Sequence, residues 1–170
     1  MERRFGCFEN YPLWMVVLTN VFSLSIYLIG LYIFYRIDIL FAALFALYIL
    51  FIEFRLLTKS CRNCYYYGKL CAFGRGKCCS LFFKKGDSKK FAKTKITMKD
   101  IIPDFLITIL PLVAGAVLLM SNFSWLILGL MTVLIVFGFF GNAFIRGSCA
   151  CKYCKQGKIG CPAEKLFKKK

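Results

Sequence analysis

Histidine is absent from this chain, and acidic residues are scarce. The 170 residues include no histidine and only eight Asp and Glu, against 24 Lys and Arg. Without histidine the chain cannot build a mixed Cys/His zinc finger or a hydrolase site with a histidine base. It also contains neither a Walker phosphate loop nor a Gly-x-Gly-x-x-Gly motif, the usual signatures of nucleotide-binding enzymes. Any catalysis would have to be redox chemistry at cysteine, so whether the protein is an enzyme is an open question at this point.

Apolar residues dominate what is present. They make up 59% of the chain, with 19 phenylalanines. Four long segments carry almost no charge, at residues 13–35, 39–57, 101–120 and 123–145. Each is long enough to cross roughly 30 Å of hydrocarbon as a helix. Because only short connections separate the members of each pair, we predict an all-α integral membrane protein with four transmembrane helices arranged as two helical hairpins.

Most basic residues lie in two stretches that follow the two hairpins. Twelve of the 24 Lys and Arg residues lie in 59–99 and eight in 146–170. Short loops rich in Lys and Arg stay on the cytoplasmic side of a membrane. We therefore expect a multi-pass protein of the cell membrane with its N-terminus, its basic loop and its C-terminus in the cytoplasm, where anionic lipid head groups would contact the lysines.

The same cysteine pattern appears in both basic stretches. The first module contains Cys61-x-x-Cys64 with Cys71 seven positions later, and the second contains Cys151-x-x-Cys154 with Cys161 seven positions later. Glycine-lysine precedes the third cysteine in each. The pattern indicates a parallel internal repeat, with a hairpin at 1–57, a Cys/Lys-rich loop at 58–100, a second hairpin at 101–145 and a Cys/Lys-rich tail at 146–170.

These cysteines are predicted metal ligands. A reducing cytoplasm disfavours disulfides, and a Cys-x-x-Cys turn presents two sulfurs to one ion. With no histidine, the sites would be all-sulfur, which suits an iron–sulfur cluster or zinc. The candidate ligands in the first module, residues 61–79, are Cys61, Cys64, Cys71, Cys78 and Cys79. Those in the second module, residues 149–161, are Cys149, Cys151, Cys154 and Cys161.

Two readings of the metal follow from the spacing. Zinc ribbons contribute two Cys-x-x-Cys turns per ion, whereas each module has one turn plus isolated cysteines, an asymmetry that favours an iron–sulfur cradle. Cys161-Pro162 is similar to the Cys-Pro that closes ferredoxin cluster motifs, although the spacing departs from theirs, and the resemblance implies an iron–sulfur centre. In another geometry, the two turns meet across the repeat axis and hold one zinc ion.

Three functions remain open from the sequence. The preferred hypothesis is a membrane-bound iron–sulfur protein that passes electrons between a soluble carrier and a larger membrane redox complex. The alternative is a zinc-stabilised, non-catalytic scaffold on which a partner docks. The third is a small transporter that uses Glu53, a carboxylate inside the second apolar segment. Nucleic-acid binding through aromatic residues among the lysines is less favoured, because those strips also suit a membrane surface.

Two smaller features complete the sequence interpretation. Cys7 precedes the first apolar segment, where a juxtamembrane cysteine is a candidate for acylation. Gly138 and Gly141 are three positions apart in the fourth segment. Small residues at this spacing permit close helix contact in membranes, and ordinary small residues of a membrane helix give the same pattern.

Overall fold

The computed structural model is helical and describes residues 6–87, 91 and 97–161. The end of the predicted tail, residues 162–170, lies outside the described residues. Within the described part there is no β-strand, and four helices are long and apolar enough to cross a membrane. These helices, together with their extensions, cover the spans Leu13–Tyr35, Ile39–Asn63, Lys99–Ser121 and Trp125–Ala150. The coarse prediction of an all-helical chain with four span-length segments is confirmed.

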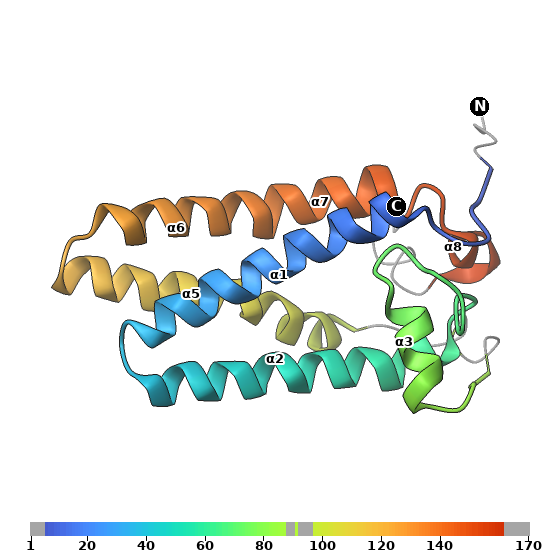
Figure 1. The fold of residues 1–170 in the computed structure, drawn as a ribbon, viewed down its shortest axis with the longest axis horizontal. Helices are drawn as coiled ribbons and strands as arrows, with labels where there is room; N and C mark the ends of the chain where they lie inside the picture. Colours follow the sequence, from blue (N-terminus) through green and yellow to red (C-terminus); the bar gives the residue numbers. More distant parts are fainter. Residues whose placement is uncertain (1–5, 88–90, 92–96, 162–170) are drawn as a thin grey trace. The chain divides into compact units, whose positions relative to one another are not determined.

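The first two long helices have nearly the predicted bounds. Helix α1 covers Leu13–Tyr35 and α2 covers Ile39–Lys59 (Figure 1). Neither helix contains proline, so no missing backbone donor interrupts them, and α1 contains no charged residue. The Asp38 carboxylate accepts a hydrogen bond from the Leu40 N–H at 2.7 Å, which satisfies a free donor in the first turn of α2.

The second pair of long helices differs more from the prediction. Helix α5 covers Met98–Ser121 and includes both Pro103 and Pro111. The fourth span begins with α6 at Trp125–Ile135 and continues through π-helical turns at Val136–Gly141 and Ile145–Ala150, which flank the short helix α7 at Asn142–Phe144. The helical backbone therefore extends five residues beyond the predicted end at residue 145.

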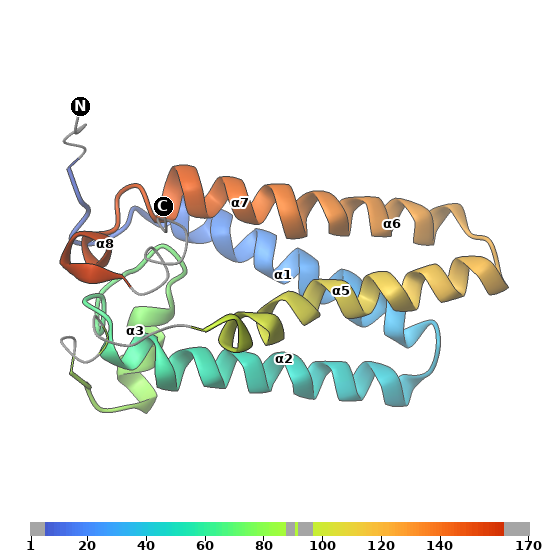
Figure 2. The same ribbon diagram turned by 180° about the vertical axis from the view of Figure 1, so that it is seen from behind.

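Short elements fill the two modules. A 3₁₀ turn covers Cys61–Asn63, α3 covers Arg75–Phe82 and α8 covers Lys155–Gly160 (Figures 1 and 2). Gly68 and Gly74 have positive φ angles of 75° and 69°. Glycine is the residue that adopts this left-handed conformation without steric cost, so these two positions let the chain turn tightly around the first module.

The chain divides into two compact units. The cysteine unit contains Met1–Asn20, Phe54–Thr97 and Phe144–Lys170, and the helical unit contains Val21–Glu53 and Met98–Ala143. The cysteine unit thus gathers both modules and the segment before α1. The helical unit holds the later part of α1, the first part of α2 and the whole of α5 and α6.

Close backbone approaches hold the helical unit together. A Cβ atom added to Gly138 would lie 2.5 Å from the Thr108 Cγ2 atom of α5, and one added to Gly141 would lie 2.8 Å from the Phe22 ring of α1. Both distances are shorter than van der Waals contact, so a larger residue at either position would force the Thr108 or the Phe22 side chain to shift. Of the two interpretations that the sequence left open, close contact is the one that these distances favour.

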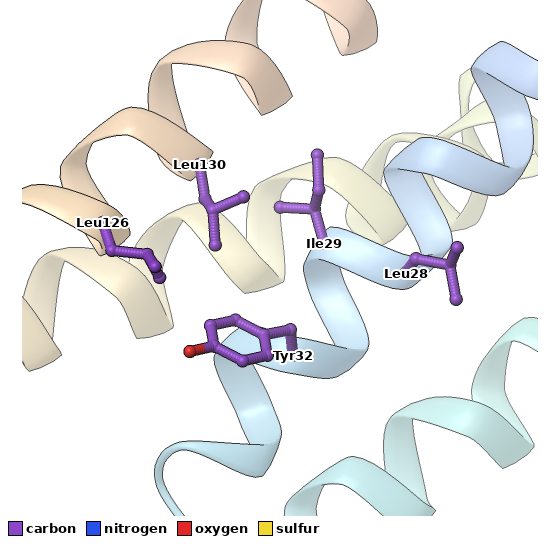
Figure 3. Close-up of a pocket in the computed structure, with 5 residues that line it drawn as sticks. All are labelled: Leu28, Ile29, Tyr32, Leu126 and Leu130. Atoms are coloured by element: carbon purple, nitrogen blue, oxygen red, sulfur yellow. The ribbon is translucent and has the colours of Figure 1, made fainter.

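The outward surface of the helical unit is apolar. Large side chains such as Leu47 and Phe51 remain more than half exposed, as expected where lipid tails would cover them. An open groove of about 380 Å³ lies between α1 and α6, and Figure 3 shows its lining by Leu28, Ile29, Tyr32, Leu126 and Leu130. The Tyr32 hydroxyl is the one polar side-chain group of this lining, so the cysteine unit is the richer source of chemistry.

Candidate functional site

The two cysteine modules pack against one buried core. Tyr11, Met15, Tyr66, Ala72 and Ala150 form this core, and each is at most 6% exposed. Four predicted ligands, two from each module, pack against it: Cys64, Cys71, Cys149 and Cys154. Segments more than 80 residues apart in the chain therefore share one interior.

The first module aims backbone N–H groups at its sulfurs. The Cys64 N–H donates to the Cys61 carbonyl oxygen at 3.2 Å, which closes the Cys-x-x-Cys turn. The Tyr66 N–H then points at the Cys64 sulfur. Further along, the Gly76 N–H donates to the Cys71 sulfur at 3.4 Å. Such donors stabilise a thiolate over a thiol, because they place partial positive charge beside the sulfur.

The second module has the same local geometry. The Cys154 N–H donates to the Cys151 carbonyl oxygen at 3.2 Å. The N–H groups of Gln156 and Gly157 point at the Cys154 sulfur. The second cysteine of each turn therefore accepts hydrogen bonds from the residues that follow it. The repeated sequence pattern produces a repeated thiol environment.

Electrostatic interactions among the thiols cross from one module to the other. Cys64 interacts with Cys154, Cys71 and Cys161, and Cys154 interacts with Cys161 in turn. In each module, the second cysteine of the Cys-x-x-Cys turn and the cysteine seven positions later take part in these interactions. We call these four the inner thiols: Cys64, Cys71, Cys154 and Cys161. In the described residues, which include all ten cysteines, no three Cys, Asp or Glu side chains are close enough to hold a metal ion. The sulfurs of the inner thiols therefore lie near one another but are too far apart to hold one metal ion.

The remaining candidate ligands occupy more varied environments. Cys61 interacts with Cys71 and Cys79. Cys79 is fully buried and donates its S–H to the Leu57 carbonyl oxygen at 3.5 Å. Cys78 and Cys151 are exposed. Cys149 lies on the last π-helical turn of the fourth span rather than in a loop.

Burial has the largest effect on the pKa of Cys64 and on that of Cys154. It raises the pKa of Cys64 to about 11, and the neighbouring thiols Cys154, Cys71 and Cys161 act in the same direction, while the Tyr66 N–H opposes them. Burial likewise raises the pKa of Cys154. With pKa values raised in this direction, the thiols of Cys64 and Cys154 stay protonated at neutral pH unless a cation is bound, and a protonated thiol is a poor nucleophile.

Hydrogen bonds across the modules fix their register. The Tyr65 N–H donates to the Gln156 Oε1 atom at 2.7 Å, and the Lys155 N–H donates to the Tyr66 hydroxyl at 3.0 Å. Gln156 is only 2% exposed. These groups were not among the predicted site residues. The sequence contained one indication of them: a polar residue stands two positions after the second cysteine of each turn, Tyr66 in the first module and Gln156 in the second.

The segment before α1 joins both modules. The Phe8 N–H donates to the Tyr153 carbonyl oxygen at 3.2 Å, and the Tyr11 N–H donates to the Leu70 carbonyl oxygen at 2.9 Å. The Tyr11 hydroxyl donates to the Ala150 carbonyl oxygen at 2.5 Å. This segment, residues 8–11, therefore acts as a strap that contacts the first and second modules.

Glu9 completes the strap with an ionic contact to each module. Its carboxylate bonds Lys155 of the second module and Lys69 of the first, the latter at 2.9 Å, and accepts a hydrogen bond from the Tyr65 hydroxyl at 3.1 Å. The hydrogen bonds from Lys155, Lys69 and Tyr65 lower the Glu9 pKa to about 2. The sequence indication for Glu9 was that acidic residues are scarce: it is one of only eight in a strongly basic chain.

The intramembrane carboxylate considered in the sequence analysis lies in the helical unit. The Tyr27 hydroxyl of α1 donates to the Glu53 Oε1 atom of α2 at 2.6 Å. A polar bond between helices in an apolar environment holds them together. Glu53 therefore has a structural role that does not require transport.

Comparisons with known proteins add no relative to this description. No known protein family, curated protein or solved structure matches the chain.

Proposed function

We propose that the chain is a membrane-anchored docking protein whose two cysteine modules close around one zinc ion bound by four thiolates. The observation that carries this proposal is the packing of both modules against a single core, with equivalent cysteines of the two repeats placed as neighbours. The sequence argument against zinc was that each module has one Cys-x-x-Cys turn. Because both modules pack against one core, each would instead contribute two sulfurs to a single ion, from the second cysteine of its turn and from the cysteine seven positions later.

The inner thiols are the proposed ligands. Cys64, Cys71, Cys154 and Cys161 are related by the internal repeat, and the first three sulfurs face backbone N–H groups. Four sulfur donors suit zinc, which is usually tetrahedral in structural sites. The chemistry of the donor set fits, while the separation of the sulfurs requires the two modules to draw closer. Metal binding that drives such ordering is common in small domains.

The ordered modules are the proposed docking surface. Loops of this size bury too little apolar area to hold one shape unaided, so a metal would contribute directly to their folding free energy. The lysines around them would favour an acidic partner. The four spans, paired as two hairpins in a parallel repeat, would fix this platform to the cytoplasmic face of the cell membrane, as the positive-inside rule predicts.

Metal analysis of matched variants tests the proposal. Protein purified anaerobically without added metal should contain one zinc per chain, and Cys64→Ser and Cys154→Ser should each lose it. Cys78→Ser is the control, because Cys78 is exposed and lies outside the inner set; it should keep the zinc. Two zinc ions per chain, or a requirement for Cys78, would contradict the shared site.

An iron–sulfur electron carrier is the second candidate. It is favoured by the N–H donors at Cys64, Cys71 and Cys154 and by the nearby lysines, since hydrogen bonds and charge near the sulfurs tune a cluster's potential. Its partners would be a soluble electron carrier and a membrane redox complex. The same preparation distinguishes the two, because iron with acid-labile sulfide and a paramagnetic signal after reduction would select the cluster.

A further inference from the structure

Helix α3 has one buried face and one exposed apolar face. On the buried side, Cys79 is 0% exposed and Gly76 is also buried. On the other side, Leu81 is 78% exposed and Phe82 is 74% exposed. Two large apolar side chains next to each other are unfavourable in water relative to burial. We therefore expect another molecule to cover these two side chains.

Two contacts hold this helix against the end of α2. The Cys79 S–H bonds the Leu57 carbonyl oxygen at 3.5 Å, and the Phe83 ring packs edge-on against Phe54 at 5.7 Å between centroids. Phe54 is itself 58% exposed on the last turns of a span-length helix. It lies five residues before the end of α2, or about 7.5 Å along the axis. Helix α3 thus lies beside the end of a span (Figures 1 and 2).

The residues that follow α3 carry positive charge. Lys84 and Lys85 are exposed and come directly after Phe83. The order Leu81-Phe82-Phe83-Lys84-Lys85 places apolar groups and then cations at one edge of the helix. That order matches a bilayer interface, where acyl chains lie below anionic head groups that attract Lys and Arg.

We propose that Leu81 and Phe82 insert into the interfacial layer of the protein's own bilayer while Lys84 and Lys85 bind anionic phospholipid head groups. Helix α3 then anchors the first module to the membrane surface, independently of any metal. A soluble protein or a second copy of the chain is less suited to this face, because its Phe54 neighbour already belongs to a span.

Depth-dependent fluorescence quenching tests this contact in the full-length protein reconstituted in vesicles. Trp14 and Trp125 are first replaced by phenylalanine, so that Phe82→Trp supplies the one indole. The matched control is Asp87→Trp, exposed and five residues further along the chain. We expect brominated phosphatidylglycerol to quench the indole at 82 at least threefold more than the indole at 87. We also expect Lys84→Gln with Lys85→Gln to reduce that quenching while leaving quenching by brominated phosphatidylcholine unchanged.

Three outcomes would overturn the proposal. Equal quenching at 82 and 87 would place α3 away from lipid, and quenching of 82 by aqueous iodide would place it in water. Protection of 82 from both quenchers, with cross-linking between chains, would assign the face to a second copy. Phe82→Trp alters one of the two side chains under test. Leu81→Trp therefore serves as a second probe, and its quenching measures the depth of α3 in the bilayer independently.

Discussion

The Tyr65 N–H donates a hydrogen bond to the Gln156 Oε1 atom, 2.7 Å away, and this bond joins the residue after Cys64 to the second residue after Cys154. Gln156 also donates from Nε2 to the Gly160 carbonyl oxygen at 3.2 Å. One buried amide therefore fixes a turn in its own module and the register of the other. The spacing of the inner thiols depends on such bonds.

Replacing this amide should loosen both modules. Gln156→Leu keeps much of the side-chain volume but leaves the Tyr65 N–H and the Gly160 carbonyl oxygen without this partner. We expect a loss of about 1–3 kcal/mol in the free energy of unfolding, the usual cost of an unsatisfied buried group. Thermal unfolding in detergent and amide exchange at Tyr65 measure it. The control is Ile159→Ala on the same helix, which is 53% exposed and should change stability by about 0.5 kcal/mol or less. Equal effects of the two variants would contradict the role of the amide.

Acid should weaken the strap through Glu9. The folded-state pKa of about 2 lies below the ordinary value of 4.5. The stabilisation from the carboxylate is therefore complete above about pH 4.5 and is lost as the pH falls toward 2. We expect the stability difference between the native chain and Glu9→Gln to be largest above pH 4.5 and to vanish near pH 2.

A double-mutant cycle isolates the ionic contact. Lys155→Gln should destabilise the native chain but have little further effect once Glu9 is replaced, because the two side chains share one bond. Both differences should shrink with added salt, since the Glu9 side chain is 58% exposed. A difference that stays constant from pH 6 to pH 2 would show that Glu9 does not stabilise the strap.

Much of the membrane portion was predictable from sequence, whereas the interior of the cysteine unit was not. Residues 13–35 form a helix with the predicted ends because a charge-free run of that length has one low-energy conformation in lipid. The fourth span continues to Ala150, past the charged Arg146 at which composition suggests an end. Hydropathy reports solvent preference and says nothing of π-helical turns.

Long-range partners explain what the sequence analysis missed. Cysteine spacing identified the candidate thiols, but the bond from Tyr11 to Ala150 joins residues 139 apart, and no local pattern specifies it. Glu9, Tyr65 and Gln156 appear as ordinary polar residues until the chain is folded. Their roles come from tertiary packing of the two modules, which periodicity does not encode.

Close packing at Gly138 should be sensitive to one methyl group. An added Cβ would lie 2.5 Å from the Cγ2 atom of Thr108, whose β-branched side chain has little freedom to move. We expect Gly138→Ala to cost about 1–3 kcal/mol in the free energy of unfolding.

The matched control for this change is Gly129→Ala in the same span. A Cβ there has no neighbour within 4 Å, so alanine should be neutral or stabilise the helix by about 0.5–1 kcal/mol. Thr108→Ser removes the clashing methyl and should recover part of the loss in the Gly138→Ala background. Unfolding in detergent measures all three variants; equal stability of the two alanine variants would be inconsistent with this contact.

The bond between Tyr27 and Glu53 should contribute modestly to stability. Tyr27→Phe removes the hydroxyl donor, and hydrogen bonds between membrane helices average about 0.6 kcal/mol with a maximum of about 1.7 kcal/mol. Tyr32→Phe, on the same helix and 37% exposed, is the control and should be neutral. If Tyr27→Phe is also neutral while Glu53→Gln abolishes substrate flux in vesicles, the result would contradict a structural role for Glu53 and support the transporter hypothesis.

Zinc-edge X-ray absorption spectroscopy of the purified chain tests the shared thiolate centre most directly. We predict one zinc per chain with four sulfur neighbours at about 2.3 Å and no nitrogen or oxygen ligand. A zinc signal with fewer than four sulfurs, or protein that contains iron and sulfide in place of zinc, would contradict the account.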